Sequence, residues 1–141
     1  MKVNVLGEIT ANEEKCYRYW AQKVLKKISH RIAVGANALN IIIVNDQFIK
    51  KLNKNFLGRN YPTDVMAFPL AKSKELIMPK EEVLWGEIYI SKDRAQIQAQ
   101  ELSITLDKEI CNLITHGILH LAGYSHQAMK KIEKMLTSNS E

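Results

Sequence analysis

The chain contains, between residues 116 and 126, the sequence His116-Gly-Ile-Leu-His120-Leu-Ala-Gly123-Tyr-Ser-His126. On a helix, residues four positions apart lie one turn above each other, so the first two imidazoles can reach one metal ion. Gly123 predicts a helix end, because glycine readily adopts the left-handed conformation found there, and the turn that follows can bring His126 back. Three neutral nitrogen ligands are typical of a catalytic zinc ion with a fourth position open to water.

The same histidine spacing occurs in a class of metalloproteases with the pattern H-E-x-x-H-x-x-G-x-x-H. In those proteases the Glu after the first histidine is the general base, whereas this chain has Gly117 at that position. The metal-binding pattern is therefore present without the base of the protease. This combination favours a hydrolase that acts on another substrate.

The helix that carries the first two histidines is expected to begin at Asp107. Apolar residues recur in it every three or four positions, which predicts one face packed on a core. These residues are Ile110, Leu113, Ile114, Ile118 and Leu121. Gly117 would allow close packing. His116 and His120 fall at the edge of the apolar stripe, so a metal ion would lie at the rim of a cleft, partly buried and open to substrate.

Shorter patterns predict the remaining elements. We expect strands at residues 2–6, 39–44, 65–68 and 83–90, helices at residues 13–28, 46–56, 92–102 and 130–136, and a polar hairpin-like loop at residues 71–82. Asn12 is the expected cap of the first of these helices. Gly86, inside a strand, indicates a bulge or a close approach of another element. The order predicts one α+β domain over residues 1–141, a small mixed sheet of about four strands packed with about five helices, the motif helix crossing one face.

Length and composition limit the class of protein. The chain has 141 residues, of which 46% are hydrophobic, as expected for one globular domain with a core. Its longest aliphatic run, residues 39–44, is far too short to cross a bilayer, and its first residues lack the apolar segment of a signal peptide. Two cysteines far apart in the sequence are typical of reduced thiols. We therefore expect a cytoplasmic protein without membrane contact.

Charge permits a polyanionic partner. Twenty Lys and Arg residues oppose fifteen Asp and Glu residues, which gives a formal net charge of +5. Basic side chains gather in residues 15–31 and 50–59. RNA could bind there, although a solvated helix face would produce the same clusters. Aromatic residues do not alternate with the basic ones in the pattern of a base-stacking surface.

Three stretches follow patterns known from one family. The histidine stretch has the form H-G-x-L-H-L-x-G-Y-x-H. Residues 53–69 contain Asn53, Phe56, Gly58, Pro62-Thr63-Asp64-Val65 and Phe68-Pro69, similar to N-x-x-[FY]-R-G-x-[DN]-x-P-T-[DN]-V-L-[ST]-F-P, and residues 85–91 are similar to L-G-D-[IL]-x-I-[SC]. Together they resemble the YbeY family, metal-dependent endoribonucleases that act in ribosomal RNA maturation. The resemblance covers most of the chain.

The chain departs from the family pattern at three positions. Ser125 stands where the family usually has Asp, and serine brings no charge to a neighbouring histidine. The family's catalytic arginine, six residues before the Thr, is replaced by Leu57, so Arg59 is the nearest arginine. Glu87 replaces an Asp, a milder change that extends the carboxylate by one methylene.

The resemblance implies a zinc ion held by His116, His120 and His126. We assign to Arg59 the stabilisation of negative charge that develops on a phosphate, because a guanidinium can donate two hydrogen bonds to it. A solvated loop position is the alternative for this arginine. Asp64 would orient part of the site or cap the turn before the strand at residue 65. No residue is identified as the general base.

The implied function is that of a zinc-dependent, single-strand-specific endoribonuclease in 16S ribosomal RNA 3′-end maturation and ribosome quality control. Its implied partners are ribosomal RNA, the small ribosomal subunit and assembly factors. Two alternatives stay open, a zinc hydrolase of another substrate class and a non-catalytic ribosome assembly factor with a structural metal. The sequence does not distinguish the cleavage position or the metal used.

Overall fold

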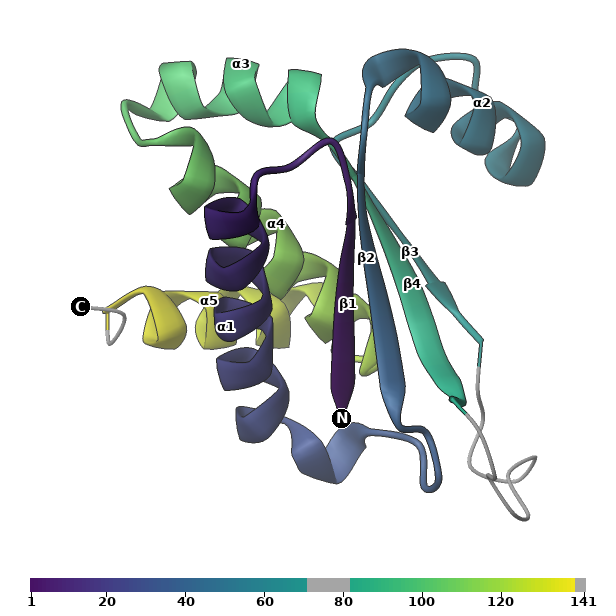
Figure 1. Cartoon of the computed structure of the whole chain (residues 1–141), viewed down its shortest axis with the longest axis vertical. Coiled ribbons are helices and arrows are strands. Elements are labelled where there is room, and N and C mark those ends of the chain that lie inside the picture. Colours follow the sequence, from purple (N-terminus) through teal and green to yellow (C-terminus); the bar gives the residue numbers. More distant parts are fainter. Residues whose placement is uncertain (71–81, 139–141) are drawn as a thin grey trace.

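The computed structural model of the chain describes residues 1–70 and 82–138, so most of the loop predicted at residues 71–82 lies outside the described residues. The strands are β1 (Lys2–Gly7), β2 (Ala38–Val44), β3 (Val65–Pro69) and β4 (Leu84–Ser91). The helices are α1 (Ala11–Lys27), α2 (Asp46–Leu57), α3 (Lys92–Leu102), α4 (Leu106–Leu121) and α5 (His126–Ser138), with a 3-10 turn at Ser29–Arg31 (Figure 1).

The described strands form one mixed sheet in the order β1-β2-β4-β3. β1, β2 and β4 run parallel, and β3 pairs antiparallel with β4 at one edge. The register between β2 and β4 shifts at Ala38 and Leu39, opposite the predicted bulge position Gly86. These elements confirm the predicted α+β fold with its four-stranded mixed sheet and five helices.

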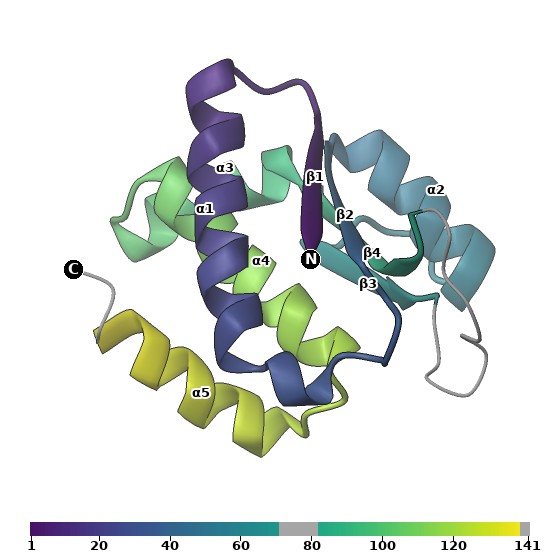
Figure 2. The same ribbon diagram turned by 60° about the horizontal axis from the view of Figure 1, so that its bottom comes forward.

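The two faces of the sheet are covered differently. α1, α4 and α5 lie on one side, and α2 lies on the other side near one end of the strands (Figures 1 and 2). Alternate residues of the strands point toward α1 and α4 and are buried with them. This core includes Val3, Val5, Leu39, Ile41, Ile43, Ile88 and Ile90 from the strands. Among the described residues, no helix is long and apolar enough to cross a membrane.

Two side-chain hydrogen bonds join α1 to α4. The Tyr17 hydroxyl donates to Asp107 Oδ1 at 2.6 Å, and Trp20 Nε1 donates to Thr115 Oγ1 at 2.7 Å. The bonded residues are 90 and 95 positions apart in the sequence, so these polar contacts join distant segments in addition to the apolar packing. They place the predicted metal-binding helix in a defined position on α1.

Three predicted element boundaries were wrong. α1 is capped by Thr10, not Asn12, because the Thr10 hydroxyl accepts from Glu13 N–H while the Glu13 carboxylate accepts from Thr10 N–H. α4 begins at Leu106 rather than at Asp107, because the Thr105 hydroxyl caps the helix by accepting from Lys108 N–H. The last helix begins at His126, so the third histidine of the motif opens a helix.

α4 lies against β4 at its glycine. A Cβ atom at Gly117 would lie 2.7 Å from Cγ2 and 3.0 Å from Cδ1 of Ile88. One helical turn further, Leu121 packs in the same way on Gly86, where a Cβ would lie 2.8 Å from the Leu121 methyl groups. The predicted close approaches at Gly117 and Gly86 are confirmed, and the helix could not approach the sheet so closely with a side chain at either position.

We predict that Gly117→Ala lowers the free energy of unfolding by about 1 kcal/mol. Overpacking a core typically costs about 1–3 kcal/mol, and the better helix propensity of alanine returns up to about 1 kcal/mol. Urea unfolding of both proteins measures the difference.

A double variant shows whether the clash with Ile88 is the cause. The double variant Gly117→Ala/Ile88→Ala should lose about 0.5–3 kcal/mol less free energy of unfolding than the two single variants lose together, because the added methyl then has room. Val3→Ala serves as the control, since β1 lies two strands from β4 and its effect should add to that of Gly117→Ala. Additivity in both pairs would contradict the packing explanation.

Candidate functional site

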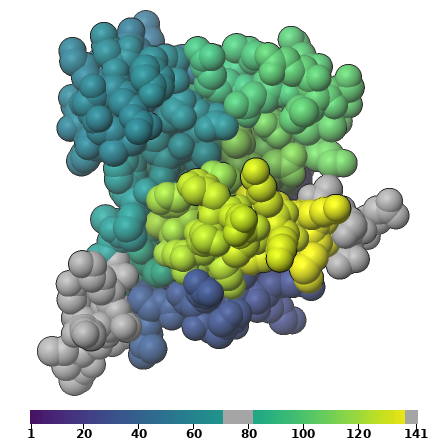
Figure 3. Space-filling view, turned by 180° about the vertical axis from the view of Figure 1, so that it is seen from behind, coloured from purple at the N-terminus to yellow at the C-terminus, as the bar shows by residue number. Residues whose placement is uncertain are grey.

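A pocket of about 530 Å³ lies where α4, the edge strand β3 and the connection after α2 meet. Every residue that the sequence analysis placed in a site contributes to its lining. The pocket is lined by Asn53, Leu57, Arg59, Tyr61, Thr63, Asp64, residues 65–68, His116, Gly117, His120 and His126. Segments far apart in the sequence are thus brought together, and the space-filling view shows α2 and α5 on the same face of the molecule (Figure 3).

The turn between α4 and α5 places the third histidine. Gly123 adopts the left-handed conformation, with φ of 79°, and its N–H donates to the His120 carbonyl at 3.0 Å. Ser125 then caps α5, because its hydroxyl accepts from Ala128 N–H at 3.2 Å. His126 follows Ser125 directly. The end of α4, the turn and the start of α5 together therefore set its position relative to His120.

His116 has a carboxylate neighbour from α5. Its Nδ1 lies 3.2 Å from Glu133 Oε1, and both side chains are partly exposed. A carboxylate on one ring nitrogen of a metal-binding histidine fixes the tautomer and leaves the other nitrogen for the metal. Glu133 was not among the site residues predicted from the sequence. Its position seven residues after His126, on the same face of a helix, would have indicated it if α5 had been predicted to begin at His126.

The three histidines offer a donor set that suits zinc, although they do not converge in this arrangement. Over residues 1–70 and 82–138, no group of three or more His, Cys, Asp or Glu side chains is close enough to hold a metal ion. His120 and His126 are exposed, and exposed side chains change rotamer within nanoseconds. The imidazoles fit the predicted metal if these two side chains turn toward His116.

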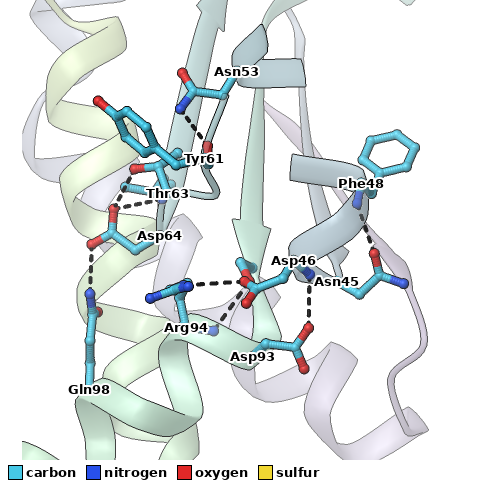
Figure 4. A network of polar contacts seen from close by, with 12 residues as sticks. Asn45, Asp46, Phe48, Asn53, Tyr61, Thr63, Asp64, Asp93, Arg94 and Gln98 are labelled. Atoms are coloured by element: carbon cyan, nitrogen blue, oxygen red, sulfur yellow. Dashed lines mark hydrogen bonds and ion pairs between the residues drawn. The ribbon is translucent and has the colours of Figure 1, made fainter. Parts of the chain in front are cut away.

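A buried asparagine shapes the connection that carries Arg59. Asn53 is 2% exposed, and its Nδ2 donates to the Tyr61 carbonyl at 2.8 Å (Figure 4). Its own carbonyl accepts from Arg59 N–H at 3.3 Å. Gly58 ends α2 in the left-handed conformation, with φ of 68°. Both sides of this loop are therefore tied to one residue of α2, one through its side chain and the other through its backbone carbonyl, which holds Arg59 at the pocket.

Asp64 is anchored at the start of β3. Its Oδ1 accepts from Val65 N–H at 2.8 Å and from the Thr63 hydroxyl at 3.4 Å, and its Oδ2 accepts from Gln98 Nε2 at 3.1 Å (Figure 4). The carboxylate therefore spans the strand start and α3. These bonds are what a structural cap requires, and the side chain also lines the pocket.

A second set of contacts joins the starts of α2 and α3 (Figure 4). Asp46 Oδ1 accepts from the Ser91 hydroxyl at 2.7 Å and lies 3.4 Å from Arg94 Nε. In return, Asp93 accepts from Asp46 N–H at 2.8 Å. This reciprocal arrangement holds α2, and with it the Arg59 connection, against the end of β4.

Comparison with known proteins places the chain that forms this pocket in a family. A family model described as Endoribonuclease YbeY matches residues 4–141. The chain belongs to the endoribonuclease YbeY family. This membership makes it a hydrolytic endoribonuclease, as the sequence analysis predicted, and RNA is its substrate class.

Individual relatives agree with this assignment. The chain is 35% identical over 119 residues to Endoribonuclease YbeY of Thermotoga neapolitana, covering 80% of this chain and 73% of the relative. It is 35% identical over 134 residues to that of a Sulfurihydrogenibium species, covering 92% and 86% respectively. The solution structure of TM1509 from Thermotoga maritima matches with a TM-score of 0.60 and 32% identity over 94% of this chain and 85% of that one.

Two departures from the YbeY pattern have a structural context. Ser125 caps α5 through its hydroxyl, and Ser and Asp are equally good caps, so this position keeps a helix-capping side chain. Leu57 is 57% exposed and lines the pocket together with Arg59. The pocket therefore contains an apolar side chain where the family has its arginine, and another arginine two residues further on.

Glu109 lies on the His116 face of α4, two turns earlier, and is 5% exposed. Burial raises the pKa of its carboxyl group, a hydrogen bond from Asn112 at 3.2 Å opposes part of the rise, and the negative charge of Asp64 adds to it. Because the folded protein holds this proton more tightly than the unfolded chain, the contribution to stability is complete below the ordinary pKa and is lost as pH rises through the folded-state pKa.

We therefore predict that Glu109→Gln is more stable than the parent protein at about pH 7 and that this advantage disappears below the ordinary carboxyl pKa of 4.5. Glutamine keeps the oxygen that accepts from Asn112 and removes the charge. Urea unfolding across this pH range measures the effect, and Glu101→Gln, at an exposed position of α3, is the control. An advantage that grows toward low pH would show that the sign is wrong.

Proposed function

We propose that this protein is a zinc-dependent, single-strand-specific endoribonuclease of the cytoplasm that acts on ribosomal RNA, in 16S 3′-end maturation and ribosome quality control. The small ribosomal subunit and its assembly factors would be its partners. One observation carries the proposal, namely that His116, His120, His126 and Arg59 line one pocket although α4, α5 and the connection after α2 supply them.

In the proposed reaction, His116, His120 and His126 would hold the zinc ion. When bound, zinc lowers the pKa of a coordinated water toward 7 and polarises a phosphoryl oxygen. Arg59 donates hydrogen bonds to the phosphate as negative charge builds on it. Glu133 keeps the His116 ring oriented through the contact at Nδ1, and Asn53 holds the Arg59 loop in place.

The recessed position of the site supports a preference for single strands. The scissile phosphate must enter a pocket between α4 and β3. Arg59, on the connection after α2, lines the same pocket. A strand in a stiff A-form duplex presents its phosphates on a broad cylinder, whereas an unpaired strand can bend into the pocket. The pocket thus favours loops and ends of RNA.

The surroundings of Gly117 and of the histidines disfavour the two alternatives. A peptidase with this spacing needs a Glu at residue 117, where a Cβ atom would already lie 2.7 Å from Ile88. A structural zinc site is normally closed by four protein ligands, yet His120 and His126 are exposed and face an open pocket. The first feature disfavours a peptidase, and the second favours a catalytic over a structural metal site.

We predict that the purified protein binds about one zinc ion per chain and that His120→Ala loses most of it, because two remaining ligands bind weakly. Competition with a chromogenic chelator measures the affinity, and removal and return of zinc should switch RNA cleavage off and on. His30→Ala is the control, since His30 lies in the 3-10 turn after α1 and does not line the pocket. Equal zinc binding by His120→Ala and His30→Ala would remove the basis of the metal assignment.

We predict that Arg59→Ala lowers kcat for cleavage of single-stranded RNA by about 10²–10³-fold with a much smaller change in KM, as for other donors to a charged transition state. Lys54→Ala, which removes an exposed charge from the last turn of α2, is the matched control.

A second variant tests whether the two arginine positions are equivalent. Leu57 and Arg59 line the same pocket, so Leu57→Arg should restore much of the rate lost in Arg59→Ala. If Arg59→Ala cleaves RNA at the parent rate, the charge-stabilising role belongs to another residue.

A further inference from the structure

The pocket has an exposed apolar side that the proposed chemistry does not use. Tyr61 is 53% exposed and Leu57 is 57% exposed, and both line the pocket with Phe68. Large apolar side chains at the mouth of a pocket mark a binding surface when they are held in place. The polar side of the pocket, by contrast, is formed by the three histidines, Arg59, Asn53, Thr63 and Asp64.

The Tyr61 ring is presented by a fixed backbone. Its carbonyl accepts from the side chain of the buried Asn53 at 2.8 Å, and the backbone carbonyl of Asn53 accepts from Arg59 N–H at 3.3 Å. Figure 4 shows the ring extending from this loop toward α4, above Thr63 and Asp64. The backbone that carries the ring is therefore fixed on the same loop as Arg59, two residues away.

Four aromatic side chains form a continuous row of ring contacts that includes Phe68 of the pocket. The ring centroids of Phe56 and Phe68 are 5.2 Å apart, those of Phe68 and Tyr89 are 5.8 Å apart, and those of Tyr89 and Phe48 are 6.0 Å apart. These residues come from α2, β3 and β4, so no sequence pattern revealed the row. Phe68 is the member of this row that lines the pocket, so the row connects the pocket to the exposed aromatic side chains of α2.

The charge near this surface indicates its occupant. Lys50, Lys51 and Lys54 lie on α2, just before Arg59. Over the described residues, no carboxylate is within ion-pair distance of Arg59. Aromatic rings beside unpaired positive charge are typical of surfaces on which single-stranded nucleic acid stacks its bases.

We propose that Tyr61 stacks on an unpaired base of the RNA strand whose phosphate lies at Arg59 and the histidines. This subsite deepens the proposed function and rests on it. The base would lie on the Tyr61 ring against Leu57, and its ribose-phosphate would turn into the polar side of the pocket. Stacking on one ring explains selection of unpaired nucleotides without selection of a particular base.

The test compares two oligonucleotides of equal length and charge. One is a fully 2′-O-methylated single-stranded RNA, checked for integrity after each measurement, and the other is the same sugar-phosphate chain without bases. Fluorescence anisotropy gives the affinity of the full-length protein for each. Tyr61→Ala removes the ring, Tyr61→Phe keeps it, and Tyr19→Ala removes a tyrosine that is 66% exposed on α1, outside the pocket.

We expect Tyr61→Ala to weaken binding of the base-bearing strand about 5- to 150-fold, the range found for loss of one stacked base. Binding of the abasic strand should be unchanged, because phosphate contacts remain. Tyr61→Phe and Tyr19→Ala should bind both strands like the parent protein.

Two results would overturn the subsite. One is an unchanged affinity of Tyr61→Ala for the base-bearing strand. If this variant then loses binding to the small ribosomal subunit instead, the ring belongs to a contact with a protein partner. The other is an equal loss for both strands.

The outcome for this subsite is separable from that for the proposed function. Base-dependent binding that requires Tyr61, in a zinc-loaded protein that cleaves no RNA, would support the subsite and refute the proposed catalysis. If Tyr61→Ala cleaves RNA and binds both strands like the parent protein, the proposed catalysis is supported and the subsite is refuted.

Discussion

The close contact between Gly117 of α4 and Ile88 of β4 sets the position of the histidine-bearing helix on the sheet, and with it one wall of the pocket. Because the helix approaches the sheet without an intervening side chain, the residues on either side of Gly117 are set at a fixed height above β4. His116 and His120 then face the gap between α4 and the edge strand β3, and this gap is the pocket. A larger residue at 117 would widen the gap and separate the histidines from Arg59. The protein therefore has a packing reason for glycine at the position where a peptidase places its base.

Much of this arrangement was predictable from the sequence. Helical spacing identified α4 and its buried stripe, and Gly123 and the two flanking histidines identified its end, because these signals are local. The alternation of Val3 and Val5 in β1 was similarly informative. Single residues also predicted close packing at Gly86 and Gly117, since a glycine within a regular element usually has a steric reason.

Other features could not be read from local patterns. Glu133 approaches His116 only because α5 folds back along α4, and Asn53 holds Tyr61 only through a loop geometry that Gly58 permits. The aromatic row combines residues from three elements, so no pattern within one segment could predict it. Phe48 and Phe56, which share the apolar stripe of α2 with Ile49, are nevertheless 47% and 65% exposed. Helix boundaries failed where two capping residues were both plausible, as at Thr10 and Asn12.

β3 forms a wall of the pocket and is also the edge of the described sheet. An open strand edge can pair with a strand of another protein, which would cover the pocket and promote aggregation. β3 has only five residues and ends in Pro69, which has no N–H to donate. A sugar-phosphate chain has no peptide groups with which to extend a sheet. The same edge can therefore stay accessible to nucleic acid while it discourages the addition of protein strands.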